Sequence, residues 1–206
     1  TSIAGSVFPL YIGAQAANDV VAFTAATSNV TANMGQGNDL ISLTNTLGLN
    51  STLAGNDGND TITIAGTLTT ATVQGNDGND SISVVAMAGG LINGNAGQDT
   101  LVLNGALSAG ARALAGSGND TINGIAASLA SGTVLNGNDG NDTITLTGAL
   151  SSSAFVNGNA GADSIAIQST ASSGVRVLGG ADNDTITVAG NLSSGAIVNG
   201  NDGKDS

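Results

Sequence analysis

Apolar residues recur along this chain in a fixed phase relative to an aspartate that closes a short Gly- and Asn-rich segment. The second and fourth residues after the aspartate are apolar, as in Ile62 and Ile64 after Asp60, and the positions between them are hydroxylated or small, as in Thr61 and Thr63. Alternation with a period of two predicts a β-strand with one buried face. A further apolar residue, seven places before the next aspartate, predicts a second short strand. Each repeat is therefore interpreted as one coil with two strands.

The repeat extends over the whole chain. Its closing aspartates, spaced by about 21 residues on average, are Asp19, Asp39, Asp60, Asp80, Asp99, Asp120, Asp142, Asp163, Asp184 and Asp205. A single coil cannot bury its apolar face, so coils must stack strand on strand. We therefore predict an all-β fold, a parallel β-solenoid of about ten coils, with residues 1–206 as a single repetitive domain. With strands about 4.8 Å apart, ten coils make a rod of roughly 48 Å.

Composition adds a strong charge asymmetry to this picture. The 206 residues include 15 acidic and 3 basic ones, for a net charge of -12, and every acid is an aspartate inside a repeat turn. Such a chain lacks the Lys and Arg that neutralise nucleic-acid phosphates, and its longest apolar stretch, residues 84–92, is far shorter than the roughly 18 residues of a membrane span. The charge instead indicates a cation as partner.

The fullest turns, residues 55–60, 75–80, 137–142 and 200–205, have the pattern Gly-Asn-Asp-Gly-x-Asp. The stretch from Gly55 to Thr63 resembles the nonapeptide of the RTX (hemolysin-type) calcium-binding repeat family, with Asn56 in place of its second glycine. The resemblance implies a β-roll stabilised by several Ca²⁺ ions, in a bacterial surface-layer, fibre or adhesin protein that is type I secreted and folds outside the cell. Because each coil has only one motif, we expect the ions along one edge, roughly one per pair of adjacent coils.

Carboxylates and backbone carbonyls are the oxygen ligands that Ca²⁺ prefers, and glycine turns allow close approach of the backbone. The candidate metal-binding residues are Asp39, Gly55, Asp57, Gly58, Asp60, Gly75, Asp77, Gly78, Asp80, Asp99, Asp120, Gly137, Asp139, Gly140, Asp142, Asp163, Asp182, Asp184, Asp202 and Asp205. The first turn, residues 14–19, has lost every glycine and is a doubtful site. An alternative is that these are ordinary solvated turns without metal.

The sequence offers no evident catalytic residues. It has no His, Cys or Glu, and its paired aspartates recur in many coils, so they do not form a single acid and base pair. We therefore predict that the protein is not an enzyme. The expected role is structural, as a fibre, filament or surface layer at the extracellular surface. The alternative is a calcium-rigidified stalk of an adhesin, or an accessory module of a secreted enzyme or toxin.

Ice binding is a lesser alternative, since a bacterial ice-binding adhesin domain has a similar architecture with stacked Gly-Thr-Gly-Asn-Asp turns and outward Thr and Asn rows. In this chain, that outward Thr row is replaced by a mixed set: Gln36, Asp57, Asp77, Ala96, Ser117, Asp139, Ala160, Ala181 and Asp202. The Thr61 and Thr63 type of alternation on the strand face keeps ice binding open, although ordinary β-propensity explains it as well.

Self-association, end to end or lateral, is the expected interaction, with cell-surface glycans as a further candidate partner; neither nucleic-acid binding nor membrane insertion is expected. Eight residues before the closing aspartate lies a mostly apolar stripe, either outward as a contact surface or absorbed by a bulkier core: Tyr11, Leu91, Arg112, Val134, Phe155, Arg176 and Ile197. Both ends of the chain are in phase with the repeat, as expected of a segment of a longer repeat protein or a filament subunit.

Overall fold

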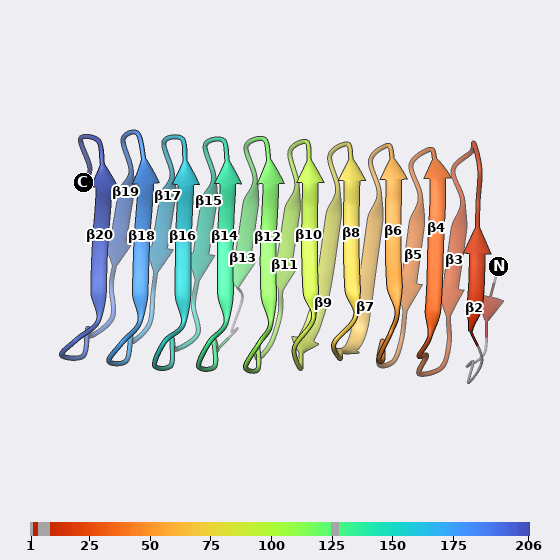
Figure 1. Ribbon diagram of the computed structural model, residues 1–206, viewed down its shortest axis with the longest axis horizontal. Helices are drawn as coiled ribbons and strands as arrows, with labels where there is room; N and C mark the ends of the chain where they lie inside the picture. Colours follow the sequence, from red (N-terminus) through yellow and green to blue (C-terminus); the bar gives the residue numbers. More distant parts are fainter. Residues whose placement is uncertain (1, 4–8, 125–127) are drawn as a thin grey trace.

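The computed structural model describes residues 2–3, 9–124 and 128–206, and these form a two-sheet parallel solenoid (Figure 1). Sheet A consists of β1 (Ser2–Ile3), β3 (Val20–Phe23), β5 (Leu40–Leu43), β7 (Thr61–Leu68), β9 (Ser81–Met87), β11 (Thr100–Leu103), β13 (Thr121–Gly124), β15 (Thr143–Leu146), β17 (Ser164–Ile167) and β19 (Thr185–Val188). Sheet B consists of β2 (Leu10–Gly13), β4 (Val30–Gln36), β6 (Thr52–Asp57), β8 (Thr72–Asp77), β10 (Leu91–Ala96), β12 (Arg112–Ser117), β14 (Val134–Asp139), β16 (Phe155–Ala160), β18 (Arg176–Ala181) and β20 (Ile197–Asp202).

The strands of each sheet are parallel and pair with the equivalent strand of the next coil. Residues at the same place in the repeat lie side by side, as in the register that joins Ile41 to Ile62 and Ile62 to Ile82. In Figure 1 the strands of sheet B lie in front and all point one way, while those of sheet A lie behind and point the other way. The predicted parallel β-solenoid with coils about 21 residues apart is confirmed.

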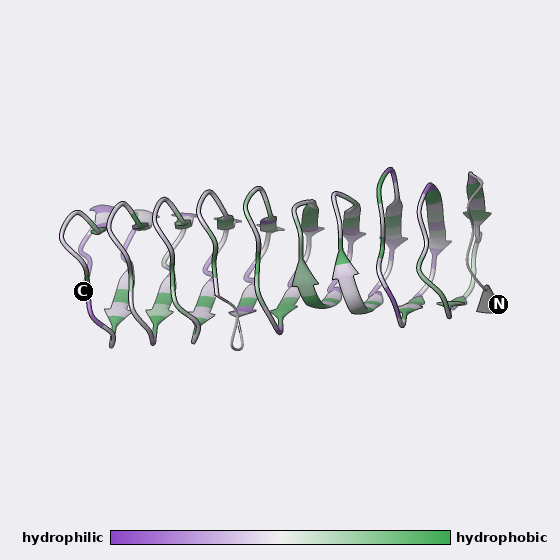
Figure 2. Cartoon of the chain, turned by 90° about the horizontal axis from the view of Figure 1, so that it is seen from below, coloured by the Kyte–Doolittle hydropathy of each residue, from purple (hydrophilic) through white to green (hydrophobic). Residues whose placement is uncertain are grey.

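Stacked apolar columns fill the space between the two sheets. The two columns predicted after each closing aspartate are buried in the middle coils, as at Ile62 and Ile64, and so is the column before it, as at Leu53. In Figure 2 apolar and polar bands alternate along the strands, as this arrangement requires. A fourth column, nine residues before each aspartate, could not be recognised as core because most of its residues are small or polar. Its buried members include Ser51, Ala71, Ala111, Thr133, Ala154 and Val175.

Five coils have a leucine eight residues after the aspartate, and this leucine is also part of the core except in the last of them. Leu150 is fully buried, whereas Leu192 in the last coil is 49% exposed. One strand position of the sixth coil is occupied by Gly124, and its neighbour Ile125 lies outside the described residues.

The two outer faces of the solenoid differ in chemistry. Sheet B presents the predicted stripe outward: Tyr11 is 80% exposed, and the Arg176 guanidinium lies 5.5 Å from the centre of the Phe155 ring. Of the two alternatives, the structure favours the outward one, since no member of the stripe is buried: Leu91, Val134 and Phe155 are half-buried and the others exposed. The use of the stripe as a contact surface stays a prediction. Sheet A instead presents Thr and Ser, with a hydroxyl in seven successive coils at Thr61, Ser81, Thr100, Thr121, Thr143, Ser164 and Thr185. Within the described residues, no helix is long and apolar enough to cross a membrane.

Candidate metal centre

The turns that lead from each strand of sheet B to the next strand of sheet A form one edge of the solenoid, here called the Asp edge. Each turn closes with the aspartate of the repeat, and we call these residues the edge aspartates. They form one row along the edge, since they occupy equivalent positions in successive coils. Eight of them are almost fully buried, with 1–3% of their surface exposed: Asp39, Asp60, Asp80, Asp99, Asp120, Asp142, Asp163 and Asp184.

Backbone hydrogen bonds hold each edge aspartate in place between its neighbours. For Asp80, the backbone N–H donates to Asp99 Oδ1 at 2.8 Å, and the backbone carbonyl accepts from the N–H of Thr100 at 2.8 Å. Its own Oδ1 accepts from the backbone N–H of Asp60 at 2.7 Å. The same N–H to Oδ1 bond connects every successive pair from Asp19 to Asp205, at 2.7–3.0 Å.

The second carboxylate oxygen has no such partner. In all eight buried edge aspartates Oδ2 is inaccessible to solvent and makes no hydrogen bond. An ionised group in this situation costs several kcal/mol unless a counter-charge or a proton compensates it. The fold therefore holds a row of oxygens that require a cation or a proton.

Burial shifts the ionisation of this row. Loss of solvent raises the pKa to about 7 for Asp80 and Asp142, and to about 6 for Asp60, Asp99 and Asp163. The backbone N–H bonded to Oδ1 acts in the opposite direction, and nearby carboxylates add to the increase. The pKa values of Asp120 and Asp184 are also raised, again mainly by burial. A bound cation would reverse these shifts, because it favours the charged form.

The position five residues before each edge aspartate is here called the cradle position. In most coils it is a glycine, whose missing side chain leaves room for the carboxylate of the aspartate. A Cβ on Gly75 would lie 2.0 Å from Asp80 Oδ2 and 2.8 Å from the carbonyl oxygen of Gly94 in the next coil. The same holds for Gly137, where the distances are 2.1 Å to Asp142 Oδ2 and 2.8 Å to the Gly158 carbonyl. A carboxylate oxygen and a backbone carbonyl of the following coil therefore converge beside these cradle glycines.

Sequence reasoning included the cradle glycines Gly55, Gly75 and Gly137 but missed Gly94, Gly158 and Gly179, which have the same surroundings. The signal was present, since all six stand five places before an edge aspartate. Gly58, Gly78 and Gly140 serve the turn differently. A Cβ on Gly58, whose φ is +122°, would lie 2.1 Å from the backbone oxygen of Gly37, so only glycine lets successive turns approach this closely.

Asn56, which stands where the RTX nonapeptide has glycine, has a φ of 81°, and the equivalent asparagines adopt the same left-handed backbone. Asparagine tolerates this region better than other residues with a side chain. A second ladder runs beside the aspartates, because Asn38 Oδ1 accepts from the Asn59 N–H, and Asn59 Oδ1 from the Asn79 N–H. These contacts align the turns from one coil to the next.

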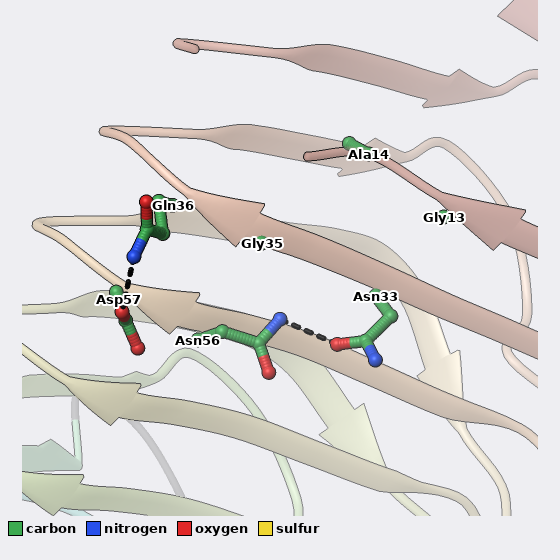
Figure 3. A pocket seen from close by; sticks show the side chains of 7 residues that line it. All are labelled: Gly13, Ala14, Asn33, Gly35, Gln36, Asn56 and Asp57. Atoms are coloured by element: carbon green, nitrogen blue, oxygen red, sulfur yellow. Dashed lines mark hydrogen bonds between the residues drawn. The ribbon is translucent and has the colours of Figure 1, made fainter. Parts of the chain in front are cut away.

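The remaining candidate aspartates lie elsewhere. Asp57, Asp77, Asp139, Asp182 and Asp202 are exposed on the outside of the turns, and Asp205 is exposed in the last coil. Figure 3 shows Asp57 at a surface pocket of about 290 Å³, where Gln36 Nε2 donates to its Oδ2 at 3.2 Å. The two aspartates of one turn thus differ in exposure, and among the described residues no three acidic, His or Cys side chains are placed together so that they could hold one metal ion. Metal binding by the outer aspartates stays a prediction.

The available donors fit a hard divalent cation. Each site offers a carboxylate oxygen and backbone carbonyl oxygen, the ligand types of Ca²⁺, whereas Zn²⁺ sites use Cys and His, which this chain lacks. Residues of two adjacent coils face each site, so an ion there would join one coil to the next.

Comparisons with known proteins agree with the fold. No protein-family model matches the chain, and no curated protein matches it. A solved structure does: a hyperactive, Ca²⁺-dependent, β-helical antifreeze protein from an Antarctic bacterium, with a TM-score of 0.78 and 24% sequence identity over 94% of this chain. The chain spans 64% of the length of that protein. The likeness establishes a shared parallel β-solenoid architecture.

Proposed function

We propose that this chain is a calcium-binding β-solenoid, in which Ca²⁺ ions along the Asp edge stabilise the stacking of the coils. The observation that carries the proposal is the row of eight buried, unpartnered Oδ2 atoms. Ca²⁺ supplies the missing counter-charge with the ligands at hand, and the calcium dependence of the solved neighbour adds support. Since the ligands come together only when coils stack, binding and folding are coupled.

Circular dichroism and small-angle X-ray scattering with calcium, with magnesium and with chelator test this proposal. We expect β-structure and a rod-shaped particle in calcium, and an expanded chain in chelator. Magnesium is the control, because it requires tighter octahedral geometry and retains water. A rod that stays equally stable in chelator and binds no calcium would contradict the proposal.

Two biological roles are compatible with a calcium-stabilised rod outside the cell. One is the structural role of a fibre, surface layer or adhesin stalk. It is supported by the repetitive architecture, in which every coil has the same kind of residues at equivalent places and none stands out as a single active site. The other is ice binding. The solved neighbour favours ice binding, because its name gives that activity and no match supports a fibre or surface layer.

The outer face of sheet A gives ice binding a second support. Its Thr and Ser hydroxyls lie about 4.8 Å apart between coils, and two residues along a strand are separated by about 6.6 Å. No charged residue occupies a strand of sheet A, since the aspartates lie in the turns of the Asp edge or at the ends of sheet B strands, and both arginines lie in sheet B. A flat, uncharged array with regular two-dimensional spacing suits a crystalline surface. The outer row of the Asp edge is less suited, because its aspartates Asp57, Asp77 and Asp139 bind water strongly.

Ice recrystallisation and thermal hysteresis measurements separate the two roles. Thr143→Lys places a charge in the centre of the sheet A face, and we expect it to reduce ice activity at least tenfold. Thr72→Lys makes the same change on the outer face of sheet B and is the matched control. Absence of ice activity in the calcium-loaded wild type would exclude ice binding, and electron microscopy for filaments or lattices would then test the structural role.

A further inference from the structure

The coils of the Asp edge are not equivalent at the cradle position. Six coils with a buried edge aspartate have glycine at the cradle position: Gly55, Gly75, Gly94, Gly137, Gly158 and Gly179. In two other coils with a buried edge aspartate, Met34 and Ala115 occupy it instead. These two belong to the aspartates Asp39 and Asp120.

Met34 and Ala115 are fully buried members of the hydrophobic core. In the glycine coils a Cβ at this place would lie 2.0–2.2 Å from the Oδ2 of the edge aspartate, far closer than nonbonded atoms approach. In the coils of Met34 and Ala115 a Cβ is present, so the carboxylate cannot place Oδ2 there.

These two coils nevertheless stack normally. Asp39 Oδ1 accepts from the Asp19 N–H at 2.7 Å, and Asp120 Oδ1 accepts from the Asp99 N–H at 2.7 Å. Backbone pairing between coils is thus independent of the cradle residue, and only the surroundings of Oδ2 change. The residue after the cradle position changes as well, from Asn in most glycine coils to Gly35 and Gly116.

We propose that the residue at the cradle position decides whether a coil binds calcium: coils with glycine bind one ion each, and the coils of Met34 and Ala115 bind none. This inference rests on the proposed calcium function and specifies its sites. The ions then belong to Asp60, Asp80 and Asp99 in one run and to Asp142, Asp163 and Asp184 in another. Asp120 separates the two runs.

The number of bound ions tests the inference. Calcium measured by inductively coupled plasma mass spectrometry after equilibrium dialysis should give six ions per wild-type chain, because the carboxylate of Asp205 is exposed and not buried like the six others. Ala115→Gly opens a seventh cradle, so we expect seven ions. Ala160→Gly, at the exposed end of β16 and outside the cradle, is the matched control and should leave six.

Two further variants address the carboxylates directly. Asp142→Asn removes the charge from a glycine coil and should reduce the count to five, whereas Asp120→Asn in the preceding coil should leave six. Circular dichroism in calcium confirms that each variant is folded before its ions are counted. These two residues differ in the residue at their cradle position, but Oδ1 of each accepts a backbone N–H of the preceding coil, from Asp99 to Asp120 and from Asp120 to Asp142. The pair of variants therefore separates ion binding from stacking.

Different results would contradict this inference and the proposed calcium binding. Eight ions in the wild type, or a count that falls equally with Asp120→Asn and Asp142→Asn, would overturn the role of the cradle position while leaving calcium binding intact. A chain that binds no calcium at all would overturn the proposed function itself.

Discussion

The two edges of the solenoid follow different rules. On the Asp edge, three residues separate each strand of sheet B from the next strand of sheet A in every coil from β4 to β19. On the opposite edge the connection varies more, for example from three residues between β7 and β8 to eight between β11 and β12. All fifteen carboxylates lie on the first edge, and none lies on the second.

This difference shows that the length of the connection is constrained on the Asp edge and not on the opposite edge. Each edge aspartate must meet the backbone N–H of the preceding coil, as Asp99 Oδ1 meets the Asp80 N–H at 2.8 Å, so an insertion there displaces a buried carboxylate. The opposite edge only has to bury an apolar side chain such as Leu68 or Leu107, which loops of several lengths can do. Spacing between aspartates therefore varies from 19 residues, at Asp80 to Asp99, to 22, at Asp120 to Asp142.

Removal of calcium should have the largest effect, and it acts on the Asp edge alone. A site held at 100 times its Kd adds about 2.7 kcal/mol to the free energy of unfolding, so six sites add on the order of 15 kcal/mol. This exceeds the whole stability of many domains. We expect thermal unfolding followed by circular dichroism to show no cooperative transition in chelator. A transition unchanged by chelator would mean that both edges hold the coils equally.

The metal-free chain should also respond to pH through the Asp edge. The pKa values of Asp60, Asp80, Asp99, Asp142 and Asp163 are raised to about 6 or 7 from an ordinary value of 3.8. Between about pH 4 and pH 7 the folded chain therefore binds more protons than the unfolded chain, and its stability decreases as pH rises. In chelator we expect more β-structure at pH 5 than at pH 7.5 by circular dichroism. Saturating calcium should abolish or reverse this trend.

Insertion of one residue into a single coil tests whether the Asp edge tolerates a change of length less well than the opposite edge. A serine inserted between Gly97 and Gln98, on the Asp edge, should displace Asp99 and break its bonds to Asp80 and Asp120, at a cost of about 3–5 kcal/mol. A serine inserted between Ser108 and Ala109, on the opposite edge, should cost less than about 1 kcal/mol. Urea unfolding in calcium gives both values. Equal costs would show that the constraint on length is not specific to the Asp edge.

Glycine substitutions give the smallest of these effects. A Cβ on Gly75 meets a carboxylate oxygen at 2.0 Å, whereas a Cβ on Gly110, on the opposite edge, meets nothing within 4 Å. We expect Gly75→Ala to destabilise the calcium-bound chain by about 2–3 kcal/mol through overpacking. Gly110→Ala, whose φ is +83°, should cost about 1–2 kcal/mol from backbone strain alone. Unfolding curves with bound-calcium counts check both, and only Gly75→Ala should lose an ion.

The sequence by itself determined the fold class, the repeat length and the position of every acid. This was possible because a solenoid repeats local signals: the alternation at Ile62 and Ile64 and the turn that ends at Asp60 recur in each coil. The core column of Ser51 and Thr133 could not be predicted, since small polar residues carry no apolar signal and are buried only by the coils above and below.

Only the tertiary structure separated the two kinds of aspartate. Asp57 and Asp60 occur in one turn and look equally suited to a metal, but Asp57 is exposed and Asp60 is 2% exposed with an unpartnered Oδ2. The structure also distinguished Ala115 from Gly94. The two residues differ by one methyl group, but in the fold only the glycine leaves space for the carboxylate of the edge aspartate. The physical reason is that both distinctions depend on atoms of the neighbouring coils, which the turn sequence does not contain.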